Sequence, residues 1–245
     1  METALSKERK TLADYPITDK WKPKHPELIQ VYTYGTPNGV KIPIALEEMD
    51  LPYEVHHIPL NDEGVKSPDF LSLNPNNKIP AIIDPNVDPE GVDGDAIGIF
   101  ESGAILTYLA NKTGQLCGIG QAGRSQILQW LFFQVGGIGP MLGQFGYFHV
   151  FDGKDIEDPR PRERFLNEAK RLLNVLNVQL ENNEWLAGDY SIADIATGPW
   201  LECIERFYKA GDVLELNSFS HVADYIDRFK TRPAVIKGWE VASVT

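Results

Sequence analysis

The chain has 245 residues, of which 42% are hydrophobic and 24% are charged, proportions typical of a globular protein with a sizeable core. Its formal net charge of -12 argues against the broad basic surface that nonspecific nucleic-acid binding requires, although a locally positive pocket for an anion is compatible with it. No apolar run reaches the roughly 20 residues of a membrane span, and residues 1–16 lack the apolar stretch of a signal peptide, so we expect a cytoplasmic protein without membrane contact.

The first 28 residues form a polar segment with three prolines, which we interpret as an extended arm rather than a domain. Tyr15 and Trp21 favour docking of this arm on another part of the protein, because aromatic rings gain free energy by burial. A disordered tail is the alternative, since chain termini are often loose.

From residue 29 onward, alternating apolar residues and helix-start signals predict the order βαβαββα. The strand at 53–58 is expected near an edge because polar residues alternate along it. Ser67 is placed to cap a short helix that has Pro68 at its first position, and Gly91–Gly94 marks a turn. The expected strands are 29–33, 53–58, 78–83 and 96–100, and the expected helices are 40–49, 67–71 and 101–110.

Beyond Gly114 the strand pattern ends, and apolar residues recur at the i, i+3, i+4 and i+7 spacing of amphipathic helices. Ser191 and Asp194 fit a capping box. An α/β segment followed by an all-helical segment implies two packed domains, at 29–113 and 124–245, with a glycine-rich boundary between them. The expected helices of the second domain include 125–133, 162–180, 192–208 and 220–230.

The first chemically suggestive segment is Thr36-Pro37-Asn38-Gly39, where the first strand turns into the first helix. The start of a helix offers free N–H groups and a partial positive charge, which stabilise an anion, including a thiolate. Thr36 and Asn38 add a hydroxyl and an amide donor. A plain helix-start turn with no function is the alternative.

Two further segments lie at strand ends. Pro80 stands where a strand should begin, and a cis bond before it would present the N–H and C=O of Ile79 to an extended peptide-like ligand, whereas a trans proline would make an ordinary turn. In Phe100-Glu101-Ser102-Gly103, Ser102 can hold a carboxylate at a helix start and Glu101 can meet an ammonium group. The pair would suit the zwitterionic end of an amino acid, although a simple N-cap would also explain it.

Together these segments resemble the glutathione transferase superfamily over residues 28–240, and most of all its Nu class of glutathione-dependent disulfide-bond oxidoreductases. The resemblance implies a thioredoxin-like N-terminal domain, an all-helical C-terminal domain, a homodimer, and glutathione as substrate or co-substrate with no metal. The motifs that carry it are Thr-Pro-Asn-Gly (36–39), Asn-Pro-Asn-Asn-Lys-Ile-Pro-Ala (74–81), Phe-Glu-Ser-Gly-Ala-Ile-Leu (100–106), the run 129–144, Ser-Ile-Ala-Asp-Ile-Ala (191–196) and Thr-Arg-Pro-Ala-Val (231–235).

The resemblance also implies roles for particular residues. Thr36 and Asn38 would stabilise the glutathione sulfur as the catalytic pair, with Asn38 also counted among the residues that bind glutathione. The main chain of Ile79, beside a cis Pro80, would hold the cysteinyl backbone, with Lys78 next to it. Glu101 and Ser102 would hold the γ-glutamyl end, and Arg171 would reach a glutathione carboxylate, unless it belongs to a solvated helix face.

Two departures from the class pattern bear on substrate preference. A glutamine that often contacts glutathione is replaced by Val65, where a backbone contact or the neighbouring Lys66 would have to substitute. A histidine pair found in some members is replaced by a stretch that reads Phe145-Gly146-Tyr147-Phe148-His149.

The turn at 36–39 contains no cysteine, and the two cysteines, Cys117 and Cys203, form no CxxC motif and no metal-like spacing with histidines. We therefore expect the reactive sulfur to be that of glutathione, in a disulfide reductase. Tyr34 lies near the place where other classes carry a catalytic side chain, but we expect Tyr32 and Tyr34 to pack or to line the pocket. Conjugation of electrophiles, reduction of hydroperoxides and non-catalytic glutathione binding are the alternatives.

Overall fold

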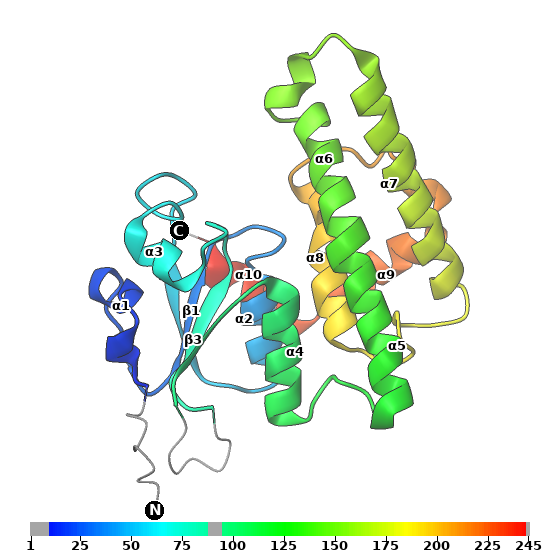
Figure 1. Cartoon of the computed structure of the whole chain (residues 1–245). Helices are drawn as coiled ribbons and strands as arrows, with labels where there is room; N and C mark the ends of the chain where they lie inside the picture. The colour runs from blue at the N-terminus through cyan, green and yellow to red at the C-terminus, as the bar shows by residue number, and fades with distance from the viewer. Residues whose placement is uncertain (1–9, 88–94, 244–245) are drawn as a thin grey trace, which may run out of the picture. The chain divides into compact units, whose positions relative to one another are not determined.

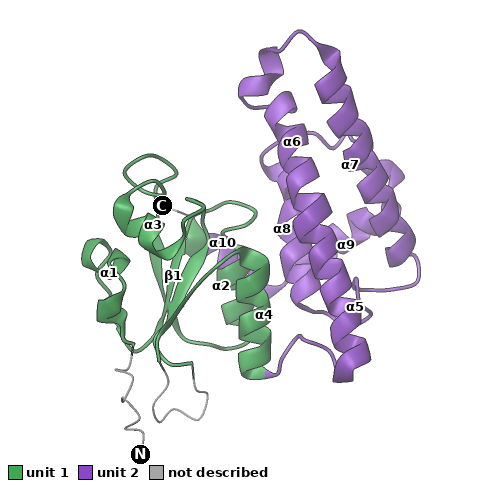
Figure 2. Cartoon of the chain, in the orientation of Figure 1, with its two compact units in different colours: residues 1–113, 241–245 green, residues 114–240 purple. Residues whose placement is uncertain are grey.

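The computed structural model describes residues 10–87 and 95–243 and consists of two compact units (Figure 2). The first unit holds Met1–Thr113 and Val241–Thr245, and the second holds Gly114–Glu240. The expected turn at Gly91–Gly94 lies outside the described residues.

A four-stranded mixed sheet forms the centre of the first unit, in the order β2-β1-β3-β4 (Figure 1). β1 runs parallel to β2 and antiparallel to β3, with Val31 opposite both Val55 and Ile82, and β4 is antiparallel to β3. The four predicted strands and the edge position of β2 are confirmed. The strands are β1 (Ile29–Thr33), β2 (Tyr53–His57), β3 (Ala81–Asp84) and β4 (Ile97–Phe100).

Helices cover both faces of this sheet, as the thioredoxin-like fold requires (Figure 1). α2 (Lys41–Glu48) packs with α4 (Ser102–Thr113) on one face, and α3 (Pro68–Leu73) packs with α1 (Ile17–Lys20) on the other. Ser67 caps α3 by accepting a hydrogen bond from the Phe70 N–H at 3.3 Å, as predicted. β3 begins three residues later than expected, because Lys78 and Ile79 lie in the loop that precedes it and Pro80 has no N–H to donate to a neighbouring strand.

The N-terminal arm is not extended as expected, because it forms a 3-10 turn (Leu12–Asp14) and the short helix α1. Tyr15 docks this segment on β4, as its hydroxyl donates to the Ala96 carbonyl at 3.0 Å and accepts from the Gly98 N–H at 2.8 Å. Ile17 is fully buried in the same core cluster. The burial of these two apolar side chains overrides the local preference of a proline-containing polar segment.

The second unit is all-helical, as predicted (Figure 1). Its expected helices are confirmed, although the one expected at 125–133 begins earlier, at Gly120, and the Ser191–Asp194 capping box is present. α6 and α10 were not predicted, because glycines and prolines interrupt their apolar pattern. The elements are α5 (Gly120–Phe133), the π-helix η2 (Gln134–Ile138), α6 (Gly139–His149), η3 (Asp152–Asp155), α7 (Pro159–Leu180), α8 (Ile192–Arg206), η4 (Leu216–Ser218), α9 (Ser220–Lys230) and α10 (Pro233–Ala242), whose last two residues are assigned to the first unit.

Over the residues that the structure describes, no helix is both long and apolar enough to cross a membrane. Cys117 and Cys203 are both buried and unpaired with each other. Burial raises the pKa of the Cys203 thiol to about 12, so this sulfur stays protonated near neutral pH.

Candidate functional site

The turn between β1 and α2 is held by side chains that bond to its own backbone. The Thr36 hydroxyl oxygen accepts from the Gly39 N–H at 3.0 Å, and the Thr36 carbonyl accepts from the Val40 N–H at 3.0 Å. The Thr33 hydroxyl donates to the Gly39 carbonyl at 2.9 Å. Because the Thr36 oxygen serves as an acceptor within the turn, its hydrogen remains to donate to a ligand.

Gly39 allows this turn to close. A Cβ atom at position 39 would lie 1.9 Å from the Tyr34 carbonyl oxygen and 2.7 Å from the Thr33 hydroxyl oxygen. Neither distance is tolerated by real atoms, so the turn that places Thr36 and Asn38 needs glycine at this position. Both side chains are half-buried at the start of α2.

The loop before β3 is organised by Asn74, a buried side chain at the end of α3. Its amide nitrogen donates to the Lys78 carbonyl at 2.5 Å, and its amide oxygen accepts from the Asn76 N–H at 2.9 Å. The Ile79–Pro80 peptide bond is cis, as the resemblance implies. The main-chain groups of Ile79 precede the first residue of β3, while the Lys78 side chain is exposed.

The junction between β4 and α4 places Glu101 in the left-handed region, at φ 71. This conformation is uncommon for a residue with a side chain, and such residues gather at ligand sites. The Glu101 carbonyl accepts from the Ile105 N–H at 2.9 Å and so begins α4, while one carboxylate oxygen accepts from the Asn76 amide at 3.4 Å. Ser102 is the first residue of the helix and is buried.

Hydrogen bonds join two of the three segments singled out from the sequence directly, and they tie the third through the helix that follows it. The Asn76–Glu101 contact connects the loop before β3 to the start of α4. Lys41, in the first turn of α2, donates to the Ser102 hydroxyl at 3.4 Å and so connects α2 to the start of α4. The candidate residues at the three segments all belong to the first unit: Thr36, Asn38, Ile79, Pro80, Glu101 and Ser102.

Lys41 is a residue of this site that sequence analysis missed. Its side chain is 1% exposed, and burial lowers the pKa of its ammonium group to about 7, against the opposing attraction of Glu101. A signal was present: Lys41 is the lone charged residue in the apolar run from Val40 to Leu46. A lysine among buried helix positions needs a polar partner, which Ser102 provides.

Other residues considered from the sequence take structural places. Tyr32 is fully buried and stacks on the His56 ring at 4.9 Å, and Tyr34 packs on the core, as expected. Val65 also belongs to the core, and Lys66 is exposed and pairs with Asp62 at 2.7 Å.

Arg171 lies on α7 in the second unit. Its guanidinium makes two hydrogen bonds to the Glu168 carboxylate, at 2.7 and 2.9 Å, on an exposed helix face. Its contact with a glutathione carboxylate stays a prediction.

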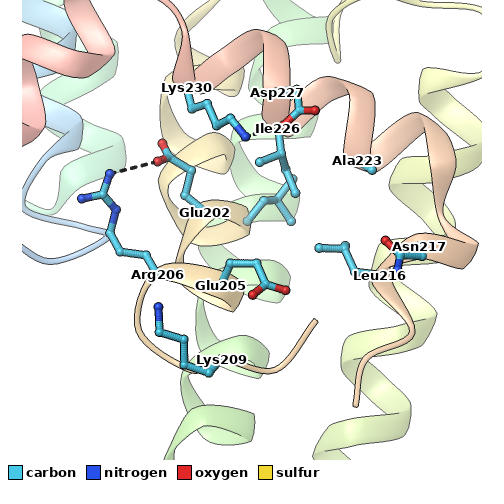
Figure 3. A pocket seen from close by; sticks show the side chains of 11 residues that line it. Glu202, Glu205, Arg206, Lys209, Leu216, Asn217, Ala223, Ile226, Asp227 and Lys230 are labelled. Carbon is cyan, nitrogen blue, oxygen red and sulfur yellow. Dashed lines mark hydrogen bonds and ion pairs between the residues drawn. The ribbon is translucent and has the colours of Figure 1, made fainter. Parts of the chain in front are cut away.

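A separate groove of about 510 Å³ lies in the second unit beside α8, η4 and α9 (Figure 3). Arg206 pairs with Glu202 at 3.4 Å, and Lys230 pairs with Asp227 at 2.5 Å, so opposite charges in the wall offset one another. None of the residues singled out from the sequence lines this groove. Within residues 10–87 and 95–243, no group of three or more histidine, cysteine, aspartate or glutamate side chains is arranged to hold a metal ion.

Comparison with known families gives two matches in this chain. Residues 36–112 match the family model of the glutathione S-transferase N-terminal domain, and residues 146–233 match that of the C-terminal domain. The first match includes the turn, the loop before β3 and the β4–α4 junction.

Curated and solved relatives are similar over nearly the whole chain. The disulfide-bond oxidoreductase YfcG of Escherichia coli is 44% identical over 208 residues, which cover 84% of this chain and 92% of that protein. A glutathione transferase from Pseudomonas putida, solved with one glutathione disulfide per subunit, is 50% identical with a TM-score of 0.90, covering 95% of this chain and 99% of that one. One from Burkholderia graminis, solved with two glutathione molecules per subunit, is 52% identical with a TM-score of 0.89, covering 96% of each chain.

Proposed function

This chain belongs to the glutathione S-transferase family, and on that premise we propose that it is a glutathione-dependent disulfide-bond reductase. The relative YfcG carries the name of a disulfide-bond oxidoreductase, and the Pseudomonas putida relative binds glutathione disulfide. Glutathione would bind at the three segments singled out from the sequence, which all lie in the first unit.

We assign the parts of the tripeptide by the chemistry of each junction. The Thr36 hydroxyl and the Asn38 amide face the sulfur, where a donor stabilises the thiolate more than the thiol. The main chain of Ile79, between Lys78 and Pro80, pairs with the cysteinyl backbone in the manner of an added strand. Ser102 holds the γ-glutamyl carboxylate, and Glu101 meets the ammonium group. Arg171 remains a candidate for a further glutathione carboxylate.

The reaction proceeds by two thiol–disulfide exchanges. A bound glutathione thiolate attacks one sulfur of the substrate disulfide, forming a mixed disulfide and releasing the other sulfur as a thiolate that takes up a proton. A second glutathione thiolate attacks the glutathione sulfur of the mixed disulfide, releasing the second substrate thiol and glutathione disulfide. Two glutathione thiols are oxidised as one substrate disulfide is reduced to two thiols.

One observation carries this assignment: the anion-stabilising turn has no cysteine, and both cysteines of the chain are buried. The nucleophilic sulfur must then arrive with the ligand, and the protein contributes its ionisation and alignment. The test is turnover of bis(2-hydroxyethyl) disulfide with reduced glutathione, followed through glutathione disulfide formation. A folded protein without turnover above the uncatalysed rate would contradict the proposal, and a parallel halonitrobenzene assay measures conjugation.

We further propose that the protein is cytoplasmic and that it acts as a homodimer, the dimer being what the resemblance implies. Sedimentation equilibrium of the full chain tests the dimer. A chain that sediments as a monomer at all accessible concentrations would remove this part of the proposal.

A further inference from the structure

Lys41 lies between the turn at 36–39 and the γ-glutamyl corner, by which we mean Glu101 and Ser102. No step of the proposed reaction uses Lys41. It lies two residues after Gly39, and its buried ammonium donates to the Ser102 hydroxyl at 3.4 Å. The charge of Glu101 acts on Lys41, and α4, on which α2 packs, begins with Ser102 itself.

The protonation state of Lys41 controls which way the Ser102 hydroxyl can point. An ammonium group has donors and no acceptor, so a charged Lys41 leaves the Ser102 hydrogen to donate elsewhere. A neutral amine has a lone pair and can accept that hydrogen, which would turn the hydroxyl inward. The Ser102 hydroxyl is therefore directed to donate to a ligand carboxylate only when Lys41 is charged.

We propose that Lys41 is a positioning residue for glutathione: its ammonium directs the Ser102 hydroxyl toward the γ-glutamyl carboxylate, so that ligand binding is coupled to protonation of Lys41. The inference rests on the proposed function, because it assumes that glutathione occupies this corner. The bound carboxylate in turn favours the charged lysine, and the hydrogen bonds from Lys41 to Ser102 and from Ser102 to the ligand strengthen one another.

The coupling has a definite sign. Burial lowers the pKa of free Lys41 to about 7, and the ligand carboxylate raises it, so binding takes up protons just above neutral pH. Affinity is then highest below the pKa of the free protein and falls as the pH rises, by at most about tenfold per pH unit.

The probe is S-methylglutathione, whose blocked thiol removes the proton release of the sulfur. Titration calorimetry at a pH just above 7, in phosphate and in Tris buffers, counts the protons taken up. We expect net uptake by the wild-type protein and weaker binding as the pH is raised further.

Two substitutions test the assignment to Lys41. Lys41→Met keeps the side-chain length and removes a buried charge, so the variant should stay folded. It should weaken S-methylglutathione binding at neutral pH by about tenfold, the effect of one charge-assisted hydrogen bond. It should also abolish proton uptake. Lys41→Arg keeps a permanent charge and should retain affinity without the Lys41-dependent pH slope. Lys237→Met, at a half-exposed lysine of α10, is the control and should behave as wild type.

A double-mutant cycle separates positioning from general structure. In the Ser102→Ala background the hydroxyl is absent, so Lys41→Met should weaken binding much less than it does in the wild type. Equal effects of Lys41→Met in both backgrounds would overturn the proposal. So would a wild-type protein that binds S-methylglutathione without proton uptake, or a Lys41→Met variant whose affinity depends on pH as that of the wild type does. Complete failure of wild-type S-methylglutathione binding is a different result, because it removes glutathione binding itself.

Discussion

The Thr36 hydroxyl has a structural role in its turn and a proposed catalytic role, and one hydroxyl group can fill both at once. Its oxygen accepts from the Gly39 N–H and so closes the turn, and in the proposed function its hydrogen donates to the ligand sulfur. The structural use would be present in any helix-start turn, whereas the catalytic use depends on a thiolate. A substitution series can separate them.

We expect Thr36→Ala to lower kcat/KM for disulfide reduction by about tenfold to a hundredfold, the value of one hydrogen bond to a charged group. The pKa of bound glutathione should rise, because the thiolate loses a donor, so the pH–rate profile should move to higher pH. Affinity for S-methylglutathione, which has no thiolate, should change little. Thr36→Ser retains the hydroxyl and should keep most of the rate; an equally impaired serine variant would contradict the role.

Gly39→Ala should distort the turn, because its Cβ would meet the Tyr34 carbonyl oxygen at 1.9 Å. We expect a loss of about 2 kcal/mol or more in the free energy of unfolding, with loss of turnover. Gly136→Ala is the matched control, since a Cβ there meets no atom within 4 Å, and it should be neutral or stabilising. Urea unfolding of both variants gives the comparison, and a wild-type-like Gly39→Ala would show that the turn is not as closed as described.

At the scale of elements, the start of α8 depends on one buried carboxylate. Asp194 accepts from the Leu186 N–H at 3.0 Å, from the Ser191 N–H at 2.9 Å and from the Tyr225 hydroxyl at 3.2 Å. It thus joins the helix start to the preceding loop and to α9. Removing it would leave buried donors without partners.

Asp194→Ala should lower the free energy of unfolding by about 3 kcal/mol, because two buried N–H groups lose their acceptor. Asp158→Ala is the comparison, as Asp158 caps the start of α7 from an exposed position with one backbone contact, to Arg160. Its effect should be much smaller, since water can replace the carboxylate. Chemical denaturation followed by circular dichroism measures both, and similar losses would contradict the importance of burial.

Elements with a regular apolar period were predictable from the sequence, and those defined by distant packing were not. α9 was predicted with its observed ends, because its apolar residues recur at the helix spacing. α6 was missed, because Gly139, Pro140 and Gly143 break that pattern, and the closeness of Gly139 and Gly143 to the Trp200 ring is not visible in the local sequence. The helical turns of the arm likewise depend on burial of Tyr15 and Ile17.

The three junctions of the site were found from the sequence because turn residues and helix starts are local signals. Lys41 was not, because a buried lysine is recognised by what surrounds it in space. The contact of Lys41 with Ser102 joins residues that are 61 positions apart, a separation that no local pattern contains.

At the scale of the whole molecule, the proposed chemistry needs no protein thiol. Cys117 is 8% exposed and Cys203 is 1% exposed, and they are the two cysteines of the chain. Turnover should then survive their removal together.

The double variant Cys117→Ser, Cys203→Ala should keep kcat/KM for disulfide reduction within about twofold of the wild type, because neither sulfur takes part in the exchange. Cys203→Ala leaves a small cavity, so stability is measured in parallel and the rate is compared at a temperature where both proteins are folded. Loss of turnover by a folded double variant would show that the protein supplies a sulfur after all.

The N-terminal segment that docks on β4 through Tyr15 also protects the protein against edge-to-edge aggregation of its sheet. β4 is one of the two edge strands of the sheet, and an exposed edge strand can pair with a strand of another molecule. Here the Ala96 N–H, directly before β4, donates to the Lys10 carbonyl at 2.8 Å, and the Gly98 N–H of β4 donates to the Tyr15 hydroxyl, so both donors are already occupied. Tyr15→Phe removes the hydroxyl that accepts from the Gly98 N–H and leaves this donor unpaired. We expect this variant to polymerise during storage before its turnover falls.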